Sequence, residues 1–320
     1  MQKTPHDPSP PPVRGATDHA AAQGGSPAAP APHDALIDVA ALRSRIGRPD
    51  LCLLDCRYDL ADPQAGLALY AQSHLPGARY AHLERDLSGA KAPRAATGRH
   101  PLPEPQALAA RLRAWGIGAA TQVVAYDASQ GCYAARAWWL LRWLGHERVA
   151  LLDGGWQAWI DAGSPTDQAV PAPPPGDFAI GAPLVASVAL AAVEDLVHRR
   201  PPGGARIVDA RAPDRYEGRN ETIDPVAGHI PGAVNRFWKD NLDERGRFKS
   251  AKRLHAEYVQ LLDGQPPEQV ILQCGSGVTA CHDLLAMHLA GLPGAALFAG
   301  SWSQWVADPA RPVATGPQPG

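Results

Sequence analysis

One cysteine, Cys274, lies where the sequence changes from a strand-like pattern to a helix-like pattern. The apolar run 270–273 ends directly before it, and glycines follow at positions 275 and 277. Glycines permit a tight turn, and the free N–H groups of a turn that leads into a helix stabilise an anion. A thiol in such a turn should lose its proton readily, and the thiolate is the nucleophilic form of cysteine. Cys274 is therefore the candidate nucleophile, and the following helix is expected to begin near Gly277 or Val278.

The remaining cysteines lack these surroundings. We assign them to packing: Cys52, Cys56, Cys132 and Cys281. Five cysteines in total, without a CxxC pair or a zinc-finger spacing, argue against a disulfide framework. With no secretory signal at the start of the sequence, this cysteine usage favours a reducing, cytoplasmic location.

Three landmarks occur twice in the same order, so the two halves are expected to be tandem copies of one domain. They are LLDCR, HLPGA and LLDGGWQAW in the first half, and IVDAR, HIPGA and LFAGSWSQW in the second. The expected parts are a disordered Pro/Ala-rich tail (1–34), a first domain (35–163), a linker (164–186) and a second domain (187–320).

Short Val/Ile/Leu-rich runs alternate with longer segments of helical period in both halves. This alternation predicts an α/β fold in which each domain has a mainly parallel sheet flanked by helices. Ligands of such sheets bind at the carboxyl ends of the strands, and Cys274 follows the end of one strand.

The first half serves as an internal comparison for the second. Where the second half has Cys274, the first half has Asp127 after the run QVVAY. A carboxylate cannot act as a sulfur nucleophile, so the first domain should be catalytically silent. Two pairs present in both halves are expected to stabilise the fold: Asp55 with Arg57, and Asp209 with Arg211.

Two arginines in the second half lack counterparts in the first. Arg215 and Arg219 follow the second strand-end Asp, and the same offsets in the first half fall on Ala61 and Ala65. Because a guanidinium binds carboxylates in a planar, bidentate manner, both are candidate substrate-binding residues. The alternative for each is a solvated surface charge.

Composition limits the other classes of function. The formal net charge is −2 with basic residues spread along the chain, which gives no support for a nucleic-acid partner. No apolar run approaches the ~20 residues of a spanning helix. Neither a His/Cys/Asp cluster of metal-ligand type nor a phosphate-loop lysine is present, so no metal and no cofactor is expected.

The repeat and the loop CGSGVTAC resemble the two-domain rhodanese-type sulfurtransferases, and the loop is most similar to that of 3-mercaptopyruvate sulfurtransferases. GHIPGAVN, TGRHPLP and the pair GGWQAW/GSWSQW fit the same resemblance, which covers the chain from about Ala35 to the C-terminus except most of the linker. It implies two tandem rhodanese-like domains, of which the second is catalytic. It also implies that Cys274 takes up sulfane sulfur as a persulfide and passes it to a thiol, cyanide or a thioredoxin-like protein.

The resemblance further implies roles for particular residues. Asp62 and His74 of the silent domain would reach across to the loop serine, Ser276; alternatively, His74 only stabilises its own turn, as His229 would in the second half. The persulfide would be held by loop N–H groups, from Gly275, Gly277, Val278 and Thr279.

The residues after Cys274 bear on the sulfur donor. Relatives specialised for thiosulfate have basic residues there, whereas this chain has Gly275 and Ser276. A serine can donate to the keto group of 3-mercaptopyruvate while Arg215 binds its carboxylate, which favours that donor. The second substrate arginine of the mercaptopyruvate enzymes would fall on Asp224 here, so either Arg219 takes over its role or the preference for 3-mercaptopyruvate is weaker than the loop suggests.

Two further readings differ in class. Phosphatases that share this fold need an arginine six residues after the cysteine, and Ala280 occupies that position. A non-enzymatic persulfide carrier or binding module stays open, and multiple turnover with a small donor would separate it from an enzyme.

Overall fold

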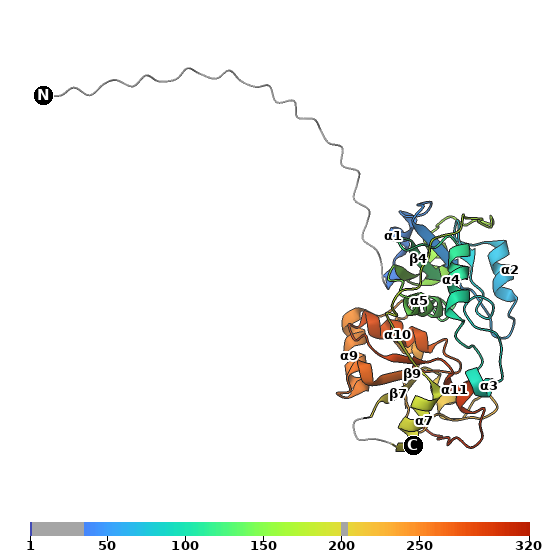
Figure 1. Ribbon diagram of the computed structural model, residues 1–320, viewed down its shortest axis with the longest axis vertical. Coiled ribbons are helices and arrows are strands. Elements are labelled where there is room, and N and C mark those ends of the chain that lie inside the picture. The colour runs from blue at the N-terminus through green and yellow to red at the C-terminus, as the bar shows by residue number, and fades with distance from the viewer. Residues whose placement is uncertain (2–34, 200–203) are drawn as a thin grey trace. The chain divides into compact units, whose positions relative to one another are not determined.

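The computed structural model describes Met1, residues 35–199 and residues 204–320. Apart from Met1, the expected tail (1–34) lies outside the described residues. Within the described ranges the chain forms two five-stranded sheets in which every strand pair is parallel. Figure 1 shows each sheet flanked by its own helices, the first in the blue-to-green part of the chain and the second in the yellow-to-red part. The predicted α/β architecture is thereby confirmed.

The two sheets have the same topology. In the N-terminal domain the order is β1 (Leu36–Ile37), β5 (Val149–Leu152), β4 (Gln122–Tyr126), β2 (Leu51–Asp55) and β3 (Arg79–Tyr80). In the C-terminal domain it is β6 (Ala186–Val188), β10 (Ala296–Phe298), β9 (Val270–Gln273), β7 (Arg206–Asp209) and β8 (Val234–Asn235).

Helices connect and cover these strands. The N-terminal domain contains α1 (Val39–Arg43), α2 (Ala65–Gln72), α3 (Arg94–Thr97), α4 (Pro105–Ala114), α5 (Ala134–Trp143) and α6 (Gly155–Asp161). The C-terminal domain contains α7 (Leu190–Arg199), α8 (Pro213–Tyr216), α9 (Ala251–Leu262), α10 (Ala280–Leu289) and α11 (Ser301–Trp305), with 3-10 turns η1 (Trp238–Asn241) and η2 (Pro267–Gln269). In the described ranges no helix is long and apolar enough to cross a membrane.

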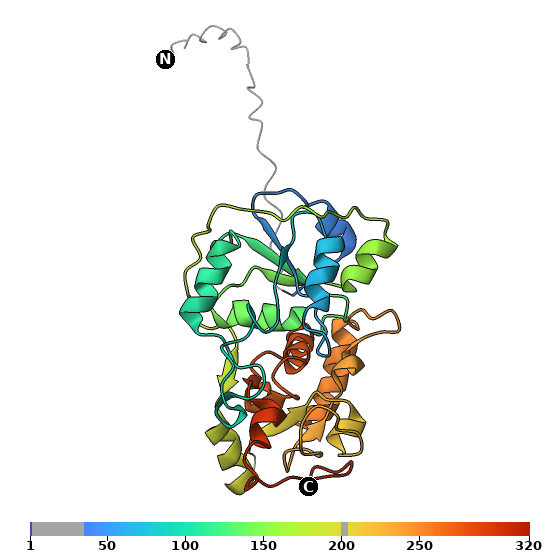
Figure 2. The ribbon, with the colours of Figure 1, turned by 90° about the vertical axis from the view of Figure 1, so that its right-hand side faces the viewer.

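Central strands are apolar on both faces because helices cover both faces of each sheet, as Figure 2 shows for the N-terminal domain. In β2, Cys52 and Leu54 pack toward α4 and α5, whereas Leu53 packs toward α1 and α6. In the same way, Leu272 of β9 joins the core with α9 and α10, and Ile271 joins the core with α7 and α11.

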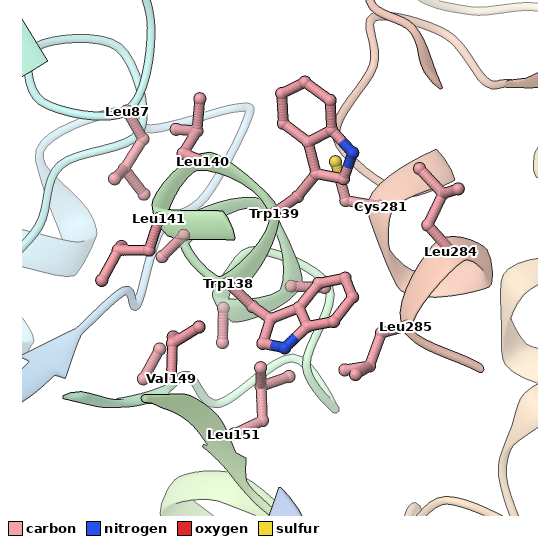
Figure 3. Close-up of a cluster of buried hydrophobic side chains, with 14 of the residues drawn as sticks. Leu87, Trp138, Trp139, Leu140, Leu141, Val149, Leu151, Cys281, Leu284 and Leu285 are labelled. Atoms are coloured by element: carbon pink, nitrogen blue, oxygen red, sulfur yellow. The ribbon is translucent and has the colours of Figure 1, made fainter. Parts of the chain in front are cut away.

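Helices α5 and α10 join the cores of the two domains into one. Trp138 and Trp139 of α5 lie against Cys281 and Leu285 of α10, and all four side chains are buried (Figure 3). The packing role predicted for Cys281 is confirmed. Since the N-terminal and C-terminal domains share this core, side chains of one domain can be held in register with loops of the other.

The pairs expected to stabilise the fold are buried in equivalent places. Asp55 binds Arg57 and Asp209 binds Arg211, each with a shortest N–O distance of 2.6 Å. Arg57 lies over Trp156 and Arg211 over Trp302. Their equal geometry in both domains confirms that these residues belong to the shared fold.

Candidate active site

The nucleophile candidate Cys274 directly follows β9, at the carboxyl end of the sheet. Its sulfur accepts a hydrogen bond from the backbone N–H of Gly277 at 3.2 Å, and the residue is 2% exposed. Gly277 has a φ of +74°, and a Cβ there would lie 2.5 Å from the carbonyl oxygen of Ala299. Only glycine fits this point of the loop, because both the backbone angle and the available space exclude a side chain.

Helix α10 begins at Ala280, two to three residues later than expected. The positive φ of Gly277 keeps residues 274–279 out of the helix, so the chain curls around the sulfur before the helical hydrogen bonds start. The cysteine therefore sits inside a loop whose N–H groups are not used by α10.

The N-terminal domain contains an equivalent loop whose N–H groups already bind an anionic side chain. Asp127 follows β4, and its carboxylate accepts four backbone hydrogen bonds of 2.7–2.9 Å, from Ser129, Gly131, Tyr133 and Ala134. Burial raises the pKa of Asp127, while the four N–H groups act in the opposite direction. A loop of this kind thus binds an anionic group of two terminal atoms, which is also the size of a persulfide on Cys274.

The loop serine, Ser276, is bound by a histidine of the N-terminal domain. The Nδ1 atom of His100 lies 2.8 Å from the Ser276 Oγ, and both residues are buried. Burial, and next the nearby Arg99 and Arg136 guanidinium groups, lower the pKa of His100 to about 3. His100 is therefore neutral at physiological pH, and its 4.0 Å approach to Glu84 is not an ion pair.

The expected partners of Ser276 lie elsewhere, which corrects that part of the sequence interpretation. His74 is fully buried, with its ring nitrogens 2.7 Å from the Tyr70 carbonyl and 3.1 Å from the Ala169 carbonyl. It stacks on Tyr70 as His229 stacks on Tyr216, so the turn-stabilising alternative describes its geometry. Asp62 is exposed and accepts a hydrogen bond from the Gln64 N–H at the start of α2.

A cavity of about 70 Å³ opens over the sulfur, between the two domains. The C-terminal domain lines it with Arg215, Ile223, Cys274, Gly275, Ser276, Val278 and Thr279. The N-terminal domain lines it with Leu60, Arg99, Cys132 and Tyr133. The cysteine loop and Arg215 therefore lie together at the cavity, as expected. Cys132, which was expected only to pack, also lines the cavity. Burial raises the pKa of the Cys132 thiol well above its usual range.

The two candidate arginines have different positions. Arg215 lines the cavity and binds Glu221 at 2.8 Å. Arg219 is 65% exposed and pairs with Glu217 on the surface, because the chain leaves α8 before reaching it. The expectation that Arg219 binds substrate is corrected: its surface alternative fits the structure.

Arg99 and His100 are the site residues that sequence reasoning missed. Both belong to the motif TGRHPLP, and a matching Gly-Arg pair precedes α9 in the second half, where Phe248 stands in place of His100. Gly98 and Gly246 share positive φ values, of 79° and 70°. A comparison of the halves that looked for features unique to the first domain would have found His100.

In residues 35–199 and 204–320, no three His, Cys, Asp or Glu side chains gather as a group that could hold a metal ion. The described site consists of a thiol, a serine–histidine pair, loop N–H groups and arginines. These groups suit nucleophilic attack on an anionic, sulfur-containing substrate.

Known proteins agree with this reading. The family described as "Rhodanese-like domain" matches residues 38–162 and 192–308. A protein of Pseudomonas aeruginosa named "Probable 3-mercaptopyruvate sulfurtransferase" is 49% identical over 282 residues, covering 88% of this chain and 98% of that protein. The thiosulfate sulfurtransferase of Bos taurus is 33% identical over 265 residues, covering 80% and 85%.

Among solved structures, SseA from Escherichia coli, described as a 3-mercaptopyruvate sulfotransferase, superposes with a TM-score of 0.71 at 30% identity. The match covers 84% of this chain and 98% of that one. On these matches, and on the duplicated fold with one cysteine loop, the chain belongs to the rhodanese-like family and is a sulfurtransferase with two rhodanese-like domains in tandem.

Proposed function

We propose that the sulfur donor is 3-mercaptopyruvate and that Cys274 carries the transferred sulfur. The observation that supports this most is the neutral loop after the nucleophile: Gly275 and Ser276 bring no charge to the sulfur, and Arg215 stands at the cavity wall. A donor with its anionic group remote from the reacting sulfur suits this arrangement better than a compact dianion does.

In the first step the Cys274 thiolate attacks the donor sulfur. An S–S bond forms, the C–S bond of 3-mercaptopyruvate breaks, and its electron pair passes into the enolate of pyruvate, which then takes up a proton. The Ser276 hydroxyl, held by neutral His100, donates to the keto oxygen where enolate charge develops. Arg215 binds the donor carboxylate.

The persulfide is stabilised by the loop N–H groups, of which Gly277 already points at the sulfur. In the second step an acceptor nucleophile attacks the outer sulfur and releases the Cys274 thiolate. A thiol gives a new persulfide and cyanide gives thiocyanate, while a thioredoxin-like dithiol gives a disulfide and hydrosulfide. We propose thiols and thioredoxin-like proteins as acceptors because the cavity is small and lies at a domain boundary, where a single cysteine side chain can enter.

Thiosulfate is the second candidate donor. It is favoured by the approach of a second guanidinium, that of Arg99, to the loop. Steady-state sulfur transfer to cyanide separates the two. We expect kcat/KM for 3-mercaptopyruvate to exceed that for thiosulfate by at least about tenfold, with both activities absent from Cys274→Ser. Equal or higher kcat/KM with thiosulfate would overturn the donor assignment, and single turnover without recycling would favour a carrier protein.

A further inference from the structure

Two arginines from different domains face the same point of the cysteine loop. A Cβ built on Gly275 would lie 3.0 Å from Nη2 of Arg99 and 3.6 Å from Nη2 of Arg215. Arg99 belongs to the segment between α3 and α4, and its side chain is 15% exposed. Both arginines line the cavity over Cys274, so each domain contributes one cation to its wall.

Asp224 fixes the orientation of Arg99. Its Oδ1 atom lies 2.7 Å from Nη1 of Arg99, and the Asp224 side chain is fully buried. The same carboxylate is 3.5 Å from Arg94 and 3.6 Å from Arg215, so it sits among three guanidinium groups. Asp224 thus accepts a hydrogen bond from only one nitrogen of Arg99, Nη1, and the Nε and Nη2 atoms are left for another partner.

The unused edge of Arg99 is a bidentate fork. Its Nε atom is buried and has no hydrogen-bond partner, and among the described residues its Nη2 has none either. Nε–H and Nη2–H point in parallel, the geometry that matches the two oxygens of a carboxylate. A buried donor without a partner is costly, so this edge is suited to a ligand that completes it.

The charge balance of the network favours an anion. Arginines 94, 99, 211 and 215 are linked by ion pairs to Asp209, Glu221 and Asp224, which leaves one positive charge in excess. The three carboxylates are 0–1% exposed and Arg94 is 46% exposed, whereas Arg99 and Arg215 line the cavity.

We propose that Arg99, supplied by the catalytically silent domain, binds the carboxylate of the donor together with Arg215, and that Asp224 is its positioning residue. The substrate site is then complete only when both domains meet. This inference rests on the proposed donor, 3-mercaptopyruvate, for its identification of the anion as a carboxylate. It also explains the acidic residue at position 224: that residue orients an arginine from the other domain.

The experiment measures how an anionic and a neutral reagent alkylate Cys274, followed by mass spectrometry of the Cys274 peptide. Iodoacetate carries a carboxylate and iodoacetamide does not, so their rate ratio reports anion binding without any sulfur donor. We expect Arg99→Gln to lower this ratio about 10–100-fold, the loss of one charge-assisted bidentate pair, and Arg99→Lys to lower it less. Arg94→Gln is the matched control: it also contacts Asp224 but is 46% exposed and does not line the cavity.

Asp224→Asn separates positioning from simple charge. If Asp224 acts only through its charge, Asp224→Asn makes the site more positive and raises the ratio of iodoacetate to iodoacetamide alkylation. If Asp224 orients Arg99, the same substitution lowers this ratio. A rise would overturn the positioning role, and an unchanged ratio in both Arg99 variants would overturn the role of Arg99.

Donor kinetics then test the proposal on the reaction itself. Arg99→Gln should raise KM for 3-mercaptopyruvate about tenfold or more with kcat changed only a few-fold, because binding is lost without loss of the nucleophile. If Arg99→Gln lowers the ratio of iodoacetate to iodoacetamide alkylation but the wild type does not use 3-mercaptopyruvate as a donor, the anion site at Arg99 is supported and the proposed donor is wrong. If 3-mercaptopyruvate turns over but neither the ratio nor KM responds, the donor stands and this inference fails.

Discussion

Substitution of His100 should lower activity, whereas substitution of His74 should lower stability, although both are buried histidines of the N-terminal domain. His100 contacts the loop serine, whereas the ring of His74 stacks on Tyr70 and its nitrogens lie against the carbonyl groups of Tyr70 and Ala169. Substituting each therefore tests whether the Ser276 partner has been identified correctly.

The expected magnitudes follow from these contacts. His100→Ala removes one buried hydrogen bond to a group that stabilises enolate charge, and about 1.5–3 kcal/mol of transition-state stabilisation corresponds to a roughly 10–100-fold fall in kcat. His100→Asn places an amide near the former Nδ1 and should restore part of this loss. His74→Ala removes two hydrogen bonds and the stacked ring on Tyr70, at a cost of about 2–4 kcal/mol in the free energy of unfolding.

The assay compares kcat for sulfur transfer with the urea midpoint of each variant. We expect His100→Ala to lose activity while the midpoint shifts little, and His74→Ala to lower the midpoint while the folded fraction keeps kcat within a few-fold. If His74→Ala abolishes activity in fully folded protein and His100→Ala does not, the assignment of the Ser276 partner is refuted.

Three other expectations concern stability, pH and the surface arginine. Asp127→Asn should lower the free energy of unfolding by about 3–6 kcal/mol, because an amide cannot accept two of the four N–H groups; a loss under about 1 kcal/mol in urea titrations would contradict this. Burial lowers the pKa of His282 to about 3. Between about pH 6.5 and pH 3, this histidine is therefore protonated in the unfolded chain and neutral in the folded chain, so the free energy of unfolding decreases as the pH falls through this range. The stability difference between wild type and His282→Gln should accordingly fall by about 1.4 kcal/mol per unit between about pH 6 and 4, and a constant difference would count against it. Arg219→Gln should leave kcat/KM for every donor within about twofold, and a tenfold loss would return this residue to the site.

The repeat made most of the fold predictable. Landmarks such as LLDCR and IVDAR mark buried strands and the ion pairs that follow them. Both copies contain an Asp and an Arg two residues apart, because each domain needs this ion pair at the end of its strand. Cys274 was also predictable, because strand end, glycines and helix start are local features that together define one loop.

Contacts between the domains were not predictable in the same way. The pairing of His100 with Ser276 joins residues 176 positions apart, and Arg99 meets Asp224 across 125 positions. No periodicity encodes such a distance, and the packing of α5 on α10 decides which loops meet. His74 shows the converse: its motif is conspicuous because the turn recurs in both domains, not because it reaches the nucleophile.

The most direct test of sulfur transfer through Cys274 is the mass of its peptide after a single half-reaction. Wild-type protein is mixed with an equimolar amount of 3-mercaptopyruvate without any acceptor, digested under non-reducing conditions and analysed by mass spectrometry, with pyruvate measured in parallel. We expect the Cys274 peptide to be heavier by one sulfur atom, pyruvate to appear in equal amount, and the peptides of the other four cysteines to stay unmodified. Pyruvate release with an unmodified Cys274 peptide, or added sulfur on another cysteine in Cys274→Ser, would contradict this mechanism.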